Sequence, residues 1–357
     1  MVRLRYRGLF AFLVLLYCWV APSSSYGQTA SPPATAADSI RVFTDSVLSL
    51  VERHSLYINT LDWETYRAEF TRKVMNEPRF LAALPHFVAL WDTLGDYHSG
   101  IQHADEWYGA PSRLDTTTMG ENVRRAFQNR KTWSIQTRVL PNQYGYIAIP
   151  SISTVDDSLA TLQAATALQD SLCRLAQADP KGWIVDLRRN LGGNMYAMLA
   201  GVHQLVQQDT FSYLLDRNGS TISSWSMGTD GVYEGQKKQM ILPKRCPFSD
   251  SHPAVAVLVG PLTASSGEIA TLAFLDQQNA VVIGEPSAGY MTGNEVYRLP
   301  FGGYVALAEA YETDRSGKKL VRIQPSTPVK GGDDFDYLLD DAKVRAAIQW
   351  LDIATKP

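Results

Sequence analysis

Two patterns of apolar residues divide the chain. Between Ser39 and Leu94, apolar side chains recur every three or four positions, which predicts amphipathic helices. The second helical stretch is interrupted by Pro85, a residue that breaks helices. From Tyr144 onward, short runs of β-branched residues alternate with longer helical runs. The pattern therefore predicts a helical domain followed by an α/β domain.

The second pattern is typical of a mostly parallel sheet. The expected strands read "YGYIAIPSI", "GWIVDLR", "AVAVLVG" and "AVVIGE", and the expected helices between them lie near 155–177, 195–207 and 265–278. Apolar strands that alternate with helices indicate a sheet covered on both faces. A later strand, "GGYVALAEAY", and a closing helix, "DDAKVRAAIQWLD", complete this part.

The N-terminus has the order of a secretory signal peptide. Three Arg residues precede the apolar run Leu9–Ala21, and Ser25 and Gly27 provide small residues for a cleavage site. The run of about 13 residues is shorter than the roughly 20 needed to span a membrane, which favours cleavage over anchoring. Large residues flank Cys18, which disfavours a lipoprotein signal. We expect an exported protein, periplasmic or secreted, with no integral membrane span after cleavage.

These signals predict five segments along the chain. They are a signal peptide (1–27), a linker (28–38), an N-terminal helical domain (39–100), a connecting segment (101–143) and an α/β core (144–357). The connecting segment is shorter than the roughly 50 residues that a separate domain usually needs, so no inserted recognition module is expected.

Charge and cysteine content exclude several classes of protein. The formal net charge is −3, and loss of the three Arg residues of the leader leaves about −6. The absence of a long Lys/Arg block argues against nucleic acid as a partner. Cys173 and Cys246 could pair in an oxidising compartment, and neither lies at a metal-binding spacing from a His. We expect no metal and no other cofactor.

A serine-bearing turn offers the first candidate chemistry. The strand "AVAVLVG" ends at Gly260, the turn "TASS" follows, and a helix begins at once. A Ser at such a junction lies beside free backbone N–H groups, which can stabilise a developing negative charge. The alternative is a helix cap, because Glu268 follows Ser265 at the spacing of a capping box.

A glycine pair and a histidine offer two more candidates. Gly192-Gly193 stands between a strand and a helix, where it could present N–H groups to an oxyanion or form an ordinary tight turn. His98 follows an apolar helix in a loop of small and polar residues. Its spacing to His103 and Asp105 does not match a helical metal-binding face.

Four motifs together resemble one family. In chain order, "LGDYHSG", "IVDLRRNLGG", "TASSGEIA" and "VVIGEPSAGY" are similar to the tail-specific, or carboxyl-terminal processing, serine proteases. That family also includes the tricorn protease core and the interphotoreceptor retinoid-binding protein. The resemblance spans roughly residues 40–350. It implies a crotonase-like α/β core with an N-terminal helical domain.

The resemblance also implies roles for individual residues. Ser265 matches the nucleophile, and the backbone N–H groups of Gly193 and Ser266 match the oxyanion hole. His98 matches the base of the tricorn-like branch. The better-known branch uses a Lys shortly after Gly-Glu-Pro, and this chain has Tyr290 there.

A Ser-Lys dyad at the usual spacing is excluded by the sequence, because no Lys occurs between Lys244 and Lys318. A His base needs an orienting group, but the late Glu of the tricorn-like branch is missing from "GKKLVRIQPSTPV". We expect Glu309 to serve instead, since it is in phase with the apolar residues of its strand, where a lone charge is costly. Glu312 and Asp96 are competitors. Glu309 could also pair with an Arg, or its strand could be wet on both faces.

The expected function is an exported serine-type peptidase that acts on peptide or protein substrates. The alternative is a non-catalytic binding protein on the same scaffold, because retinoid-binding relatives show that the fold can hold apolar ligands. An α/β-hydrolase esterase is excluded. Its His would follow the nucleophile, and the last His here is His252.

Overall fold

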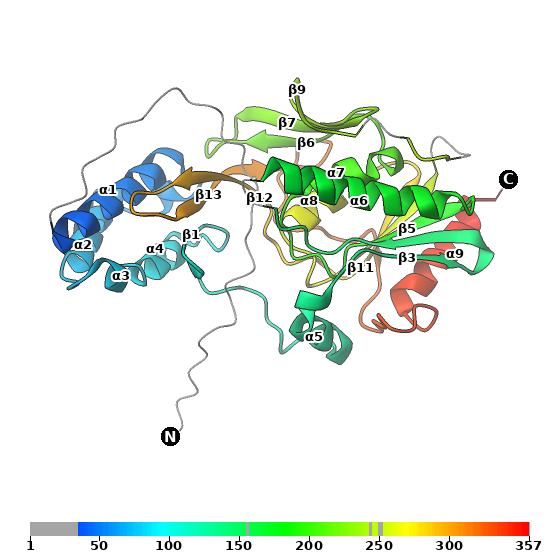
Figure 1. Ribbon diagram of the computed structural model, residues 1–357, viewed down its shortest axis with the longest axis horizontal. Coiled ribbons are helices and arrows are strands. Elements are labelled where there is room, and N and C mark those ends of the chain that lie inside the picture. The colour runs from blue at the N-terminus through cyan, green and yellow to red at the C-terminus, as the bar shows by residue number, and fades with distance from the viewer. Residues whose placement is uncertain (1–34, 155–156, 243–244, 249–252, 357) are drawn as a thin grey trace. The chain divides into compact units, whose positions relative to one another are not determined.

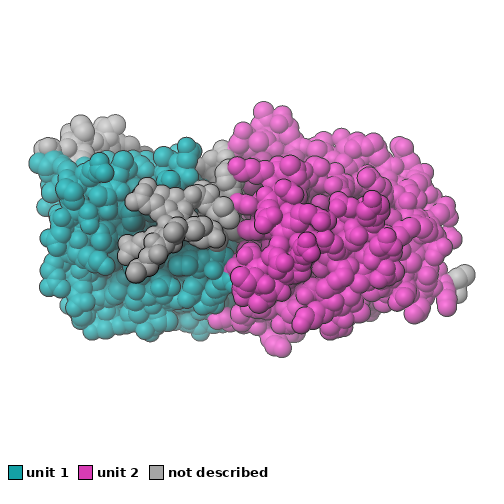
Figure 2. Space-filling model, turned by 90° about the horizontal axis from the view of Figure 1, so that it is seen from below, with its two compact units in different colours: residues 1–113, 216–219, 292–311 teal, residues 114–215, 220–291, 312–357 magenta. Residues whose placement is uncertain are grey.

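The structure is a computed structural model that describes residues 35–154, 157–242, 245–248 and 253–356. The expected signal peptide at 1–27 and most of the expected linker at 28–38 lie outside these residues. The chain divides into two compact units (Figure 2). Unit 1 comprises Met1–Arg113, Asp216–Gly219 and Thr292–Tyr311, and unit 2 comprises Leu114–Leu215, Ser220–Met291 and Glu312–Pro357.

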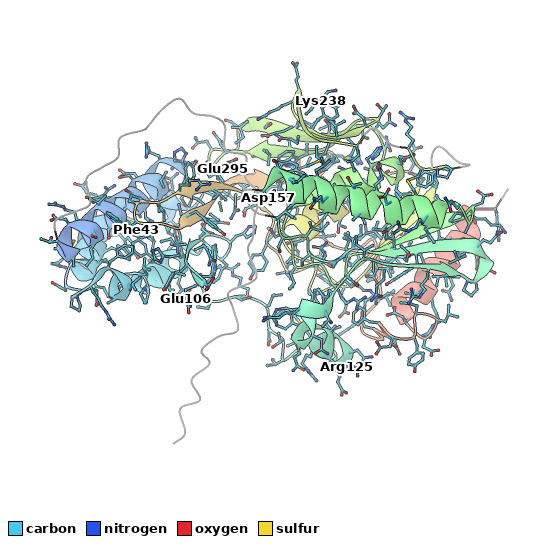
Figure 3. The ribbon with its side chains drawn as sticks, viewed as in Figure 1. Phe43, Glu106, Arg125, Asp157, Lys238 and Glu295 are labelled. Carbon is cyan, nitrogen blue, oxygen red and sulfur yellow. A yellow bond between two sulfur atoms is a disulfide. The ribbon has the colours of Figure 1, made fainter. Side chains whose placement is uncertain are left out.

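Unit 1 contains the helices that the apolar periodicity predicts. They are α1 (Ala36–His54), η1 (Ile58–Thr60), α2 (Trp63–Val74), α3 (Phe80–Ala83) and α4 (His86–Leu94). Pro85 separates α3 from α4, as expected. Phe43 on α1, labelled in Figure 3, packs edge-on against Phe80 and Phe87. This apolar cluster also contains Trp91 and Leu94 and is the core of the unit.

Unit 1 also contains four antiparallel strands, which belong to an eight-stranded sheet. They are β1 (Gly100–His103), β2 (Glu106–Gly109), β12 (Thr292–Arg298) and β13 (Tyr304–Glu312, with only its last residue in unit 2). β13 pairs with both β1 and β12. Val305 and Leu307 of β13 belong to the apolar core of the helices. This core is therefore completed by a strand that follows the helices by about 200 residues in the chain.

The parallel sheet expected from the sequence lies in unit 2. Its strand order is β14-β11-β10-β5-β4-β3, and all neighbours are parallel except β3 and β4. The strands are β3 (Gln136–Leu140), β4 (Tyr144–Ala148), β5 (Gly182–Asp186), β10 (Ala254–Val259), β11 (Ala280–Gly284) and β14 (Thr327–Pro328).

Helices cover this sheet, as Figure 1 shows. They are α6 (Ser158–Ala176), α7 (Met195–Val202) with η4 (His203–Leu205), α8 (Ser266–Leu272) and α9 (Ala342–Ala354). Alternate residues such as Tyr146 and Ile184 pack against Leu351 of α9. The residues between them, such as Ile147 and Val185, are also buried. Both faces are therefore covered, and the fold is mixed α/β, as predicted.

Several elements of unit 2 were not expected. Four antiparallel strands follow α7: β6 (Thr210–Leu215), β7 (Thr221–Met227), β8 (Gly231–Glu234) and β9 (Lys237–Ile241). Their Ser, Thr and Lys residues weaken the apolar alternation that would reveal them. The expected connecting segment contains α5 (Glu121–Gln128), η2 (Arg130–Thr132) and, before β4, η3 (Pro141–Gln143). The strand "GGYVALAEAY" is β13 and lies outside the parallel sheet.

Among the described residues, no helix combines the length and the apolar character needed to cross a membrane.

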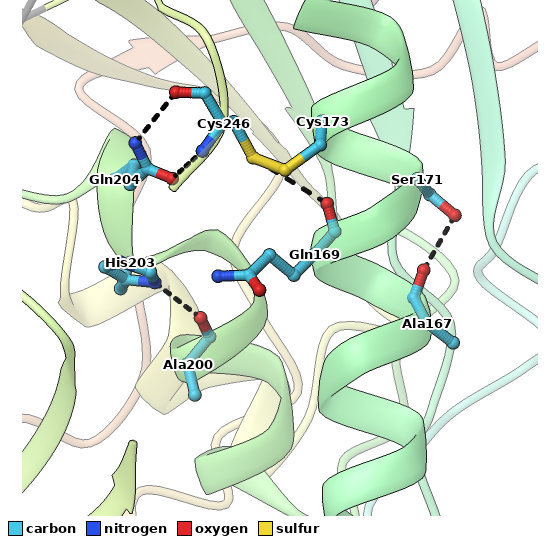
Figure 4. Close-up of a disulfide and its surroundings, with 8 residues drawn as sticks. All are labelled: Ala167, Gln169, Ser171, Cys173, Ala200, His203, Gln204 and Cys246. Atoms are coloured by element: carbon cyan, nitrogen blue, oxygen red, sulfur yellow. Dashed lines mark hydrogen bonds between the residues drawn. A yellow bond between two sulfur atoms is a disulfide. The ribbon is translucent and has the colours of Figure 1, made fainter. Parts of the chain in front are cut away.

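A disulfide joins Cys173 on α6 to Cys246, in the segment before β10 (Figure 4). The pair encloses a sequence separation of 73 residues, and both cysteines are buried. Gln204 holds the Cys246 backbone from both sides: its Oε1 accepts the N–H at 2.6 Å, and its Nε2 donates to the carbonyl at 3.4 Å. The pairing that the sequence left open is thus present in the structure.

We expect the double substitution Cys173→Ser and Cys246→Ser to lower the free energy of unfolding by about 4 kcal/mol, because a closed loop of this length restricts the unfolded chain. Urea unfolding with and without reductant measures the effect. The double variant is the control, since reductant should shift the wild type alone. Equal midpoints for oxidised and reduced wild type would contradict the prediction.

Candidate functional site

Ser265 occupies a strained backbone position at the start of a helix. It lies between β10 and α8, is the N-cap residue of α8 and is 4% exposed. Its φ of 52° with ψ of −123° is a conformation that residues with a Cβ rarely adopt. Such strain costs of order 1–3 kcal/mol and persists only where surrounding contacts impose it. Strained residues of this kind cluster at functional sites.

Hydrogen bonds to backbone and side-chain groups hold the Ser265 turn in place. Ala264 N–H donates to the Asn190 carbonyl at 2.9 Å, and Thr263 Oγ1 donates to the Leu187 carbonyl at 2.9 Å. On the helix side, Ser265 N–H donates to Glu268 Oε2 at 2.8 Å. The turn is thus tied to the loop after β5 on one side and to α8 on the other.

The Glu268 carboxylate collects four donors in a fully buried position. Oε2 accepts from the N–H groups of Ser265 and Tyr290, each at 2.8 Å. Oε1 accepts from Gly289 N–H at 2.9 Å and from the Ser287 hydroxyl. Burial raises the pKa of Glu268 to about 7, against the lowering effect of these hydrogen bonds. The bond to Ser265 N–H matches the capping interaction that the sequence suggested, but the same carboxylate also fixes the segment that follows β11.

Both the backbone conformation and the lack of space require glycine at positions 192 and 193. Gly192 and Gly193 have φ of +103° and +116°, which favours glycine at both positions. A Cβ on Gly192 would lie 2.8 Å from Ser265 Cβ, and one on Gly193 would lie 2.2 Å from the Ile152 carbonyl oxygen. The turn therefore passes directly against Ser265, with no room for any side chain.

Hydrogen bonds hold the glycine turn against α8. Asn190 Oδ1 accepts from Gly192 N–H at 2.9 Å, and Ser266 Oγ donates to the Gly193 carbonyl at 2.6 Å. Ser266 is the first residue of α8, so its N–H has no acceptor within the helix. Unit 2 thus brings together Ser265, Ser266 and Gly193, the residues that the sequence analysis selected from separate motifs.

A buried ion network supports the same loop from the β5 end. Arg188 is 2% exposed and pairs with Asp186 at 2.6 Å, Asp341 at 2.6 Å and Asp333 at 3.0 Å. Asp333 also pairs with buried Lys343 at 2.7 Å. Buried charges are tolerated when they are paired in this way. The network fixes the chain two residues before Asn190.

His98 lies in unit 1, between α4 and β1. Asp96 accepts from the N–H groups of His98 at 3.1 Å and of Ser99 at 2.9 Å, as well as from the Ser99 hydroxyl. Ser99 Oγ in turn accepts from Ala308 N–H of β13 at 2.8 Å. These contacts fix the backbone that carries the imidazole.

A second set of contacts fixes the imidazole ring. His98 Nδ1 lies 2.5 Å from Thr292 Oγ1. Thr292 Oγ1 donates to Asn294 Oδ1 at 2.8 Å, and Asn294 Nδ2 donates back to the His98 carbonyl at 2.9 Å. Burial lowers the pKa of His98 to about 3, so the ring is neutral at neutral pH. A neutral imidazole can accept a proton.

Glu309 takes a different place from the one expected. Its Oε1 accepts from Tyr297 OH at 2.6 Å, and its Oε2 lies 3.6 Å from Nδ1 of His54. The partner of His98 Nδ1 in the structure is Thr292 and not Glu309. Glu309 is in phase with buried Val305 and Leu307, as expected, but Tyr297 on the neighbouring strand β12 donates a hydrogen bond to its carboxylate.

Asp96 and Glu312, the two competing candidates for orienting His98, bind other groups in the structure. Asp96 binds backbone and hydroxyl donors of its own turn and no ring nitrogen of His98. Glu312 lies in unit 2, where it accepts from Ser212 Oγ at 2.6 Å and from Trp225 Nε1 at 3.1 Å. Within the described part of the chain, no group of three or more His, Cys, Asp or Glu is placed to hold a metal ion.

Three residues that hold the candidate groups of the two units carry little signal in the sequence. Asn190, Thr292 and Asn294 are common polar residues in loops or at a strand start, and nothing in their spacing marks them. The only available signal was for Asn190, which immediately precedes the "LGG" stretch. Their importance follows from contacts between segments that are distant in the chain.

Glu268→Gln should change how stability depends on pH. Between pH 4.5 and about 7 the unfolded chain releases the Glu268 proton and the folded chain retains it, so the free energy of unfolding falls as pH rises. Gln cannot titrate. The free energy of unfolding of the wild type should therefore exceed that of the variant by a margin that shrinks by roughly 3 kcal/mol between pH 4.5 and 7.5. Urea unfolding measures both values. Glu106→Gln, at an exposed position labelled in Figure 3, is the control. Parallel stability curves for Glu268→Gln and wild type would contradict the prediction.

Comparison with known proteins places this site in context. The chain is 22% identical over 340 residues to the nisin-resistance protein of Lactococcus lactis subsp. lactis, covering 95% of this chain and 93% of the relative. It is 28% identical over 170 residues to a carboxyl-terminal-processing protease of Picosynechococcus sp., covering 47% of this chain and 34% of that protein.

Solved structures show the same fold. A lipoprotein from Streptococcus agalactiae superposes with a TM-score of 0.67 at 24% identity, over 92% of this chain and 99% of that one. Residues 143–329, just over half of the chain, match the profile of Peptidase family S41. This match includes the Ser265 turn and the glycine pair. The chain therefore belongs to peptidase family S41 and is a serine peptidase.

Proposed function

We propose that Ser265 is the nucleophile of this peptidase, that His98 is its general base, and that the N–H groups of Gly193 and Ser266 form its oxyanion hole. The observation that carries the proposal is the strained Ser265 backbone at the N-terminus of α8, with the glycine turn packed against its side chain. A helix N-terminus and a glycine turn both supply backbone N–H groups where negative charge would develop.

The reaction would proceed as acyl transfer. His98 Nε2 removes the Ser265 hydroxyl proton as Oγ attacks the peptide carbonyl, and the tetrahedral oxyanion is stabilised by the two N–H groups. His98 then protonates the leaving amine, which leaves an ester on Ser265. Water, deprotonated by the same imidazole, hydrolyses the ester and regenerates the serine. Peptides or proteins are thus the proposed substrates.

A histidine is favoured as the base because the chain has no suitable lysine. Tyr290 stands where the Lys-using relatives have their base, and its N–H serves instead to bind Glu268. Proton transfer by a positioned imidazole contributes typically 10²–10⁴-fold to a rate.

We further propose that the parallel sheet of unit 2 is a crotonase-like core.

We also propose that the enzyme is exported, to the periplasm or beyond. The leader-like segment at 1–27 supports this location, as does the Cys173–Cys246 disulfide, since such bonds persist in oxidising compartments. Two similar proteins, named a nisin-resistance protein and a lipoprotein, favour a place at the cell envelope.

A fluorophosphonate probe should label the wild type and fail to label Ser265→Ala, because the probe reacts with activated serine hydroxyls. Labelling is followed by mass spectrometry of the intact protein. Ser171→Ala is the control, since the hydrogen bonds of this Ser stay within α6, where its hydroxyl donates to the Ala167 carbonyl and accepts from Arg174. Failure of the folded wild type to react would favour a non-catalytic binding protein. Labelling that survives in Ser265→Ala would refute the assignment of the nucleophile.

Gly193→Ala should slow labelling about 100-fold, the scale of losing one oxyanion donor, because the new Cβ must displace the turn from the Ile152 carbonyl. Gly219→Ala provides a matched control. Gly219 also has positive φ, at +82°, but a Cβ there meets nothing within 4 Å. Equal labelling rates in the two variants, with both proteins folded by circular dichroism, would exclude the turn from the oxyanion hole.

A further inference from the structure

We propose that Thr292 and Asn294 are positioning residues that hold His98 in its Nδ1–H tautomer, so that Nε2 carries the lone pair. This inference rests on the proposed function of His98, and it supplies the orienting group that the sequence analysis sought in an acid. It is carried by the three hydrogen bonds that run from the His98 ring, through Thr292 and Asn294, back to the His98 carbonyl.

The donors in this ring of contacts can be assigned in order. The His98 carbonyl can only accept, so the Asn294 group 2.9 Å from it is the NH₂. Asn294 Oδ1 therefore faces Thr292, and an amide oxygen can only accept. The single hydroxyl hydrogen of Thr292 must then point to Asn294, 2.8 Å away.

The tautomer of the ring follows from this order. Thr292 Oγ1 has given its only hydrogen to Asn294, so it can only accept at the 2.5 Å contact with His98 Nδ1. Nδ1 must therefore carry the proton. In a neutral imidazole one nitrogen is protonated and the other has the lone pair. The opposite assignment would turn Asn294 Oδ1 toward the His98 carbonyl and place two acceptors against each other.

The burial of these hydrogen bonds, here called the His98–Thr292–Asn294 relay, favours one tautomer of the His98 ring. Thr292, Asn294 and His98 are each less than 10% exposed, so water cannot readily replace a missing partner. Thr292 and Asn294 begin β12, which pairs with β13, and β13 also pairs with β1, directly after His98. The relay therefore belongs to the fold of unit 1. It uses neutral groups, which orient a neutral ring without the charge that an Asp or Glu would bring.

Thr292→Val tests the proposal, because it keeps the shape of the side chain and removes the hydroxyl. We expect the fluorophosphonate labelling rate to fall about 100-fold, since an Nε2–H ring cannot accept the serine proton. Thr292→Ser should restore most of the rate. Thr44→Val is the matched control: Thr44 is also buried in unit 1, and its hydroxyl has no hydrogen-bond partner among the described residues.

A spectroscopic measurement separates this proposal from the proposed function. Nitrogen NMR of ¹⁵N-histidine-labelled Ser265→Ala protein distinguishes the protonated ring nitrogen from the one with the lone pair, and the His98 signals are assigned by their loss in His98→Gln. We expect Nδ1 protonated in this background, and a shift toward Nε2–H when Thr292→Val is added.

The outcomes are distinct. An Nε2–H ring in the presence of Thr292, or an unchanged tautomer after Thr292→Val, would overturn the relay even if Ser265 is the nucleophile. Conversely, labelling that persists in Ser265→Ala would overturn the proposed nucleophile and leave the tautomer result standing. If Thr292→Val slows labelling while Thr292→Ser and Thr44→Val do not, a purely structural effect of the substitution is excluded.

Discussion

The buried carboxylate of Glu268 is the contact on which the candidate site depends. It accepts the Ser265 N–H at the start of α8 and the N–H groups of Gly289 and Tyr290 in the segment after β11. A carboxylate in a fully buried position loses its hydration, and here backbone donors replace the water. The same atoms that satisfy Glu268 hold Ser265 in a backbone conformation that it would otherwise leave.

One short segment serves both halves of the proposed mechanism. Ser287, Gly289 and Tyr290 bind Glu268, while Thr292 and Asn294, only a few residues later, bind His98. The serine side and the histidine side are thus linked through a continuous stretch of backbone. Here the segment supplies hydrogen bonds to two separate groups and no base of its own.

Much of the architecture could be predicted, for physical reasons that act locally. The alternation of β-branched runs with helical runs identified β4, β5, β10 and β11, because buried parallel strands must be apolar on both faces. Pro85 marked a true helix break. The antiparallel strands β6 to β9 were missed, because strands with many polar residues lack a clear period and depend on their neighbours for stability.

The sequence by itself determined the family and the residues that stand out chemically: a serine at a strand-to-helix turn, a glycine pair, a histidine after a helix, and the lack of a lysine. Only the tertiary structure decided what surrounds them. It placed Glu309 beside Tyr297, and it placed the His98 ring beside Thr292, which is 194 residues away in the chain. Hydrogen-bond partners of buried groups are chosen by proximity in the folded chain, and residue type or spacing does not encode that proximity.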